Sequence, residues 1–132
     1  MGKTSFHILR VGTAVTFLWI GILILKSPIA WGGYLMPWAA RLLPIPIEQA
    51  MIGTAILDIG IGVLLLVDLF TWVAAALGAI HLVIVLAVSG ITEITVRDVG
   101  LLAAVIGLLI DSMPGTAVNI FKSGKKKVES NI

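Results

Sequence analysis

The chain has 132 residues, of which 59% are hydrophobic and 12% are charged, and its net charge is +2. Soluble domains contain about 25% charged residues, so this composition predicts an integral membrane protein instead of a soluble domain. The chain has no cysteine, which excludes disulfides and Cys-ligated metal or iron–sulfur sites, and its few charges form no basic face for nucleic acid.

The first apolar segment covers residues 8–26 and predicts a membrane-spanning helix that ends at Lys26, before a Ser-Pro pair. A cleavable signal peptide is the alternative interpretation. Arg10 interrupts the apolar run, and Pro28 stands where a small residue should precede a cleavage site. We therefore expect a retained helix.

Residues 27–47 form a connector punctuated by prolines, which prevent one long helix. Trp31, Tyr34 and Trp38 still follow an approximately helical spacing, and such aromatic side chains gather at the level of the lipid headgroups. We expect a short amphipathic segment on the membrane surface. An anchoring belt of interfacial aromatics is preferred here over a ligand site.

The next two apolar segments, 48–67 and 71–89, each carry one ionisable group near the middle, Asp58 and His81. Each group lies ~15 Å from the start of its helix, near the midplane of a ~30 Å hydrocarbon core. The tight turn between the segments makes them antiparallel neighbours, which predicts an Asp58–His81 pair. Two interpretations stay open: a proton-holding or ligand-contacting pair, and a polar clamp that fixes helix register.

A fourth helix is predicted over residues 96–110, and residues 111–115 end it. Asp111 at its end should lie at the depth of Arg10 in the first helix, so we expect a salt bridge between them, with a site for an anionic lipid headgroup as the alternative. Asp98, in the first turn, complements the helix dipole, and we expect no functional role for it.

These segments predict an all-α integral membrane fold: a bundle of four transmembrane helices over residues 1–115, followed by a basic polar tail over 116–132. Lys and Arg favour the cytoplasmic side of the membrane. Their distribution places both termini in the cytoplasm of a multi-pass cell-membrane protein. One side of the bundle holds Lys3, Arg10, Lys122 and Lys125 to Lys127, and the other holds Lys26, Arg41 and Arg97.

No self-contained active site is visible in the sequence, and no catalytic residue is assigned. His7 lies at the membrane surface and His81 near the midplane, so the chain alone cannot form a bis-His haem site. His and carboxylate residues show no metal-ligand spacing, and no phosphate-binding loop or nucleophile motif occurs.

Three stretches resemble the DoxX-like family of small four-helix membrane proteins: Arg10 with Phe17–Gly21, then Leu57–Leu66, then Val96–Ser112. In that family the first helix begins with an Arg, the second carries an acidic residue before small residues, and the fourth tends to end in an Asp. The matching positions here are Arg10, Asp58 and Asp111. The first and third stretches are also similar to a related family of inner-membrane proteins linked to reactive-chlorine resistance.

The resemblance implies a membrane subunit of a redox or quinone-linked complex, since named members include the small subunits of the archaeal thiosulfate:quinone oxidoreductase. A quinone at a shared interface, with Asp58 and His81 near it, is then the expected cofactor. Expected partners are the bilayer and either other membrane subunits or further copies of the chain. Two alternatives stay open: a structural accessory subunit, and a small proton-coupled transporter that works as an oligomer with Asp58 as the carrier group.

Overall fold

The structure is a computed structural model that describes the backbone of residues 1–132 and the side chains outside 116–118 and 120–122. The chain is helical throughout, without strands along its backbone. Its elements are α1 (Lys3–Lys26), α2 (Pro28–Gly32), α3 (Pro37–Leu42), α4 (Ile47–Leu66), α5 (Thr71–Ser89), α6 (Val96–Ser112) and α7 (Gly115–Ser130).

Three of these helices, α1, α4 and α5, are long and apolar enough to cross a bilayer. The predicted all-helical membrane protein is confirmed at this level. The fourth expected crossing, α6, has 17 residues and carries charged residues in its first and last turns, so it does not join the three. A fourth span stays a prediction.

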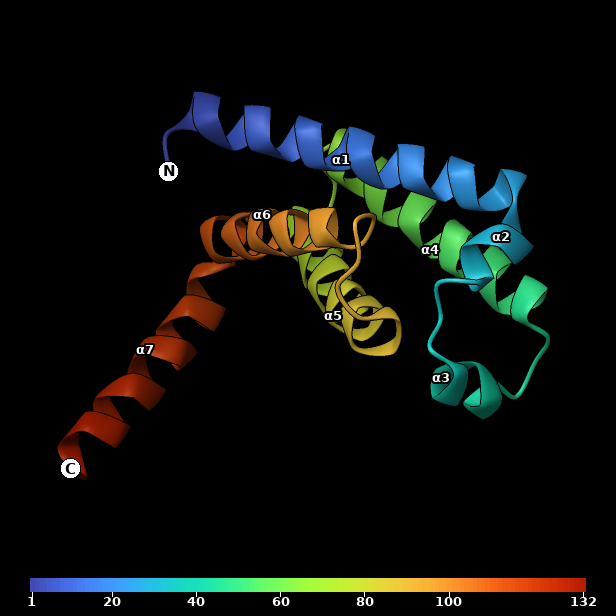
Figure 1. Cartoon of the computed structure of the whole chain (residues 1–132). Helices are drawn as coiled ribbons and strands as arrows, with labels where there is room; N and C mark the ends of the chain where they lie inside the picture. Colours follow the sequence, from blue (N-terminus) through green and yellow to red (C-terminus); the bar gives the residue numbers. More distant parts are fainter.

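The helices form two packed pairs, α1 with α4 and α5 with α6, joined where α4 meets α5 and where α1 meets α6 (Figure 1). The short α2 packs against α4, while α3 lies farther out along the connector between α1 and α4. Residues 116–132 are expected as a polar tail. In the structure α7 continues through most of this segment and leads away from the bundle (Figure 1).

Small residues let α1 and α4 approach closely. A Cβ added to Gly21 of α1 would lie 2.9 Å from the carbonyl oxygen of Ala55 and 2.7 Å from Ile59 Cγ1. On α4, a Cβ added to Gly62 would lie 3.0 Å from the carbonyl oxygen of Ala14. A glycine of each helix thus lies against the backbone of the other, and these two contacts fix how α1 and α4 are aligned along their lengths.

The core between the helices is apolar and is centred on Phe17, which is 1% exposed and faces Gly78 of α5. Large apolar side chains also cover the outside of the bundle, as at Trp19, Ile84 and Ile110. A surface of this kind is suited to lipid, because hydrocarbon does not penalise exposed apolar side chains. The buried core consists of Ala14, Phe17, Ile20, Ile24, Ala55, Ile61, Leu65, Ala74, Ala75, Leu82, Leu101, Val105 and Leu108.

The connector is attached to the bundle at two points. A Cβ at Gly32 would collide with Ile47, so α2 lies directly on the start of α4. Farther along, the backbone N–H of Met36 donates to the carbonyl of Val88 at 2.9 Å. Gly90, which has φ +70°, ends α5 beneath the Met36 side chain. The connector therefore spans from α4 to the end of α5.

Candidate functional site

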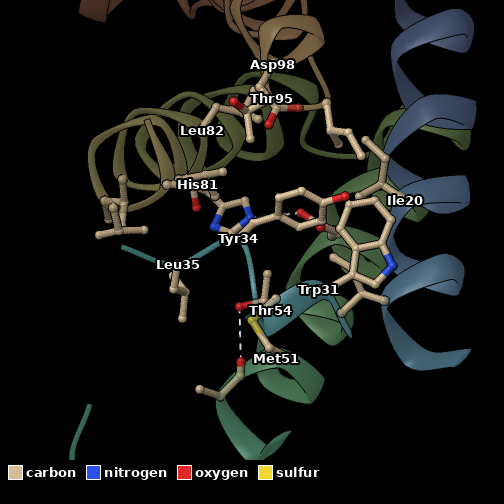
Figure 2. A pocket seen from close by; sticks show the side chains of 18 of the residues that line it. Ile20, Trp31, Tyr34, Leu35, Met51, Thr54, His81, Leu82, Thr95 and Asp98 are labelled. Carbon is tan, nitrogen blue, oxygen red and sulfur yellow. Dashed lines mark hydrogen bonds and ion pairs between the residues drawn. The ribbon is translucent and has the colours of Figure 1, made fainter. Parts of the chain in front are cut away.

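A cavity of about 270 Å³ lies between the four long helices and beneath the connector. Every one of α1, α4, α5 and α6 contributes side chains to its wall, most of them apolar (Figure 2). The polar side chains in the lining are Tyr34, Thr54, Asp58, His81, Ser89, Thr95, Arg97 and Asp98.

Asp58 and His81 meet on the cavity wall, with Asp58 Oδ1 3.0 Å from His81 Nε2. Their side chains are 5% and 12% exposed. The turn that joins α4 to α5 is short because Asp68 and Phe70 adopt positive φ, which reverses the chain within a few residues. The sequence predicted this contact, and the structure brings the two side chains together.

The aromatic residues of the connector divide into two groups. Trp31 and Tyr34 line the cavity, with their ring centroids 5.7 Å apart, and Tyr34 lies toward His81 in Figure 2. Trp38 is 47% exposed, is not part of the lining, and its Nε1–H points to the sulfur of Met36. The anchoring belt stays a prediction for all three residues, while Trp31 and Tyr34 also form part of the cavity wall and Tyr34 is 37% exposed.

Asp98 is the residue that the sequence reasoning missed. Its side chain lines the cavity and is 8% exposed, and its Oδ1 lies 3.6 Å from Arg97 Nε. Asp98 shares the buried face of α6 with Leu101, Val105 and Leu108, at helical spacing. That spacing was the available signal, since a carboxylate on the apolar face of a helix is not explained by the helix dipole alone.

Arg97 joins the connector to this wall of the cavity. Its guanidinium carbon lies 5.3 Å from the centre of the Trp31 ring, which is within cation–π range. The Arg97 side chain is 38% exposed, so its positive charge lies at the rim of the cavity. One cation thus contacts both an aromatic side chain of α2 and the buried carboxylate of Asp98.

At the opposite end of the bundle Arg10 is 8% exposed and caps α4. Its Nη1 donates to the carbonyl of Leu65 and, at 2.9 Å, to the carbonyl of Leu66, while Nε lies 3.7 Å from Asp68 Oδ1. The last carbonyls of a helix have no partner within the helix, so a neighbouring guanidinium is a natural donor.

The predicted Arg10–Asp111 salt bridge is therefore not formed in the structure. Asp111 Oδ1 instead pairs with the N-terminal ammonium group of Met1, at a distance of 3.1 Å. The sequence predicted similar depths for the two residues. Because α1 packs mainly against α4, however, Arg10 contacts the end of α4 and not the end of α6.

The cavity can hold a small, mostly apolar molecule and exchange a proton with it, because an imidazole and two carboxylates border one apolar space. Among the residues whose side chains are described, no three His, Asp or Glu residues are grouped as a metal site would require. No protein-family model, curated protein or solved structure matches this chain.

Proposed function

We propose that the protein is a small membrane subunit that binds the ring of a quinone in this cavity, as part of a redox-linked membrane complex. The observation that carries the proposal is the buried Asp58–His81 pair on the wall of an apolar, aromatic cavity. The DoxX-like resemblance of Arg10, Asp58 and Asp111 supports the same assignment.

The residues of the cavity fit a quinone ring. Ligand pockets for drug-sized molecules measure roughly 300–1,000 Å³. The cavity of about 270 Å³ suits a single ring and leaves an isoprenoid tail to the surrounding lipid. Trp31 and Tyr34 offer flat surfaces for stacking, and His81 and Tyr34 offer hydrogen-bond donors.

A bound quinone would supply a group that takes up two electrons and two protons, with the electrons coming from a partner subunit. The chain's own residues would hold the ring and move protons. Asp58 Oδ1 lies 3.0 Å from Nε2 of His81 and holds the imidazole in place. An imidazole in this position can give or take a proton at the ring.

The proposal includes four crossings, with α6 as the fourth and both termini in the cytoplasm of a cell-membrane protein. The apolar side chains of Ile106 and Ile110 on α6 are 41% and 67% exposed, as expected for a helix in contact with lipid. The exposed lysines Lys125–Lys127 follow α6, in agreement with a cytoplasmic C-terminus.

The test is a binding titration of a short-tailed quinone onto the full chain in lipid nanodiscs, followed by tryptophan fluorescence. A charge-assisted hydrogen bond contributes about 1.5–3 kcal/mol, so His81→Gln and Asp58→Asn should weaken binding by roughly 10- to 150-fold. Trp31→Phe should remove most of the quenching, whereas Trp38→Phe, the matched control outside the cavity, should preserve it. Equal affinity in all four variants, or no binding to the unaltered chain, would refute the proposal.

A second candidate is the small proton-coupled transporter that acts as an oligomer. The specific observation in its favour is that Asp58, His81 and Asp98 border one cavity, so a proton and a small substrate could occupy the same space. Proton movement across liposomes without quinone binding would favour this candidate. If the chain neither binds quinone nor moves protons, and Asp58→Asn still assembles into a larger complex, the accessory role is the remaining candidate.

A further inference from the structure

Asp98 lines the same cavity as the Asp58–His81 pair. It occupies the first turn of α6, next to the connector, whereas Asp58 lies near the middle of α4. Figure 2 shows Asp98 and Thr95 on one wall of the cavity, with His81 and Tyr34 across from them.

Most elements around this part of the cavity contribute charged or titratable groups. α6 contributes Asp98 and Arg97, α4 contributes Asp58, α5 contributes His81, and the connector contributes the hydroxyl of Tyr34. The side chains that α1 adds to the lining are all apolar. Two carboxylates thus face one permanent cation, Arg97, and one imidazole.

An apolar cavity favours a net charge of zero, because an uncompensated charge is costly in a medium of low dielectric constant. With Arg97 positive and both carboxylates ionised, one further proton is needed for neutrality. Asp58, His81 and Asp98 are the groups that can hold it.

The geometry points to a route for that proton: we propose that Asp98 is the group through which the Asp58–His81 pair exchanges its proton with the connector side of the membrane. The inference rests on proton exchange in the proposed function, but not on the identity of the ligand. It assigns Asp98 a role in proton transfer that the helix dipole alone does not require.

The steps balance as a transfer of one proton. Nε2 of His81 faces Asp58, so in the neutral imidazole Nδ1 is the ring nitrogen that can accept a proton. For uptake, the Asp98 carboxylate takes a proton from solvent at the rim, where Arg97 is 38% exposed. The O–H bond of Asp98 then breaks as an N–H bond forms at Nδ1 of the neutral imidazole, through water in the cavity, and release runs the same steps in reverse. A volume of about 270 Å³ accommodates several waters, each of which fills roughly 30 Å³.

The test measures proton exchange at His81 by ¹⁵N NMR of the histidine-labelled full chain in nanodiscs without quinone. The chain has two histidines, so His7 serves as an internal reference. Asp98→Asn should slow exchange at His81 on the order of 10²-fold, the contribution of a positioned proton-transfer group. Asp98→Glu should restore most of the rate, and Asp111→Asn, the same change on the exposed end of α6, should leave it unaltered.

A purely electrostatic role gives a different result. Removal of the Asp98 charge would then move the titration midpoint of His81, but exchange measured at that midpoint would stay fast, and the proposal would be overturned.

A measurement on the unaltered chain covers the case in which Asp98→Asn does not fold. In phosphatidylcholine liposomes with a single protein orientation, His81 should respond promptly to a pH step on the connector side; a faster response from the α7 side would also overturn the proposal. Failure here leaves quinone binding to be decided by its own titration.

Discussion

Gly21→Ala should destabilise the bundle, because α1 and α4 touch at this glycine. An added Cβ would lie 2.9 Å from the carbonyl oxygen of Ala55 and 2.7 Å from Ile59 Cγ1. The Ile59 side chain can rotate, but the Ala55 carbonyl belongs to the α4 backbone and can yield only if the helices separate. Forcing a methyl group into a packed contact costs about 1–3 kcal/mol.

Gly12→Ala is the matched control on the same helix, since a Cβ at Gly12 meets no atom within 4 Å. Both changes gain the same helix propensity, up to ~1 kcal/mol in favour of alanine. The difference between the two variants therefore isolates the packing cost at Gly21, expected at about 1–3 kcal/mol in the free energy of unfolding. The assay is reversible unfolding in detergent, followed by circular dichroism. Equal unfolding free energies for the two variants would refute the close contact.

Three further changes test other parts of the structure, each through unfolding free energies in the same detergent. Arg10→Met should destabilise by roughly 1–3 kcal/mol, because the buried carbonyls at the end of α4 lose their donor; an unchanged stability would show that water replaces the guanidinium. Phe70→Gly should stabilise by about 0.5–1 kcal/mol, because Phe70 is 64% exposed and has φ 48°, a conformation costly for a residue with a Cβ; a loss of stability would show that its ring packs usefully. A double-mutant cycle of Asp58→Asn and His81→Gln should give a coupling energy of roughly 0.6–1.7 kcal/mol, as for other hydrogen bonds within membranes; strictly additive effects would contradict the contact.

Helix positions could be predicted well, because apolar runs and their Gly or Pro boundaries are local features. The segments expected at 71–89 and 48–67 correspond to α5 and, within one residue, to α4. The first helix begins earlier than expected, at Lys3, since no helix-breaking residue separates Lys3 from the apolar run at residue 8. The short polar lead simply adds turns to a helix that the apolar run already favours.

Contacts between helices could be predicted only where the chain restricts the choice. Asp58 and His81 lie on consecutive helices joined by a tight turn, so equal depth was enough to pair them. Arg10 and Asp111 lie on helices at opposite ends of the sequence, and equal depth did not determine which neighbour each would face. The end of α4 stands nearer to Arg10 and offers the carbonyls of Leu65 and Leu66 as acceptors.

The cavity could not be predicted because a segment distant in sequence closes it. The hydrogen bond from Met36 to Val88 holds the connector over the ends of α4 and α5, and no local pattern specifies that bond. A spacing of aromatics such as Trp31 and Tyr34 suits a headgroup belt and a cavity wall equally well. Their place on the cavity wall follows from where the connector is attached. Since Arg97 contacts both Trp31 and Asp98, any movement of the connector that admits a ligand also alters the environment of the carboxylate proposed to carry the proton.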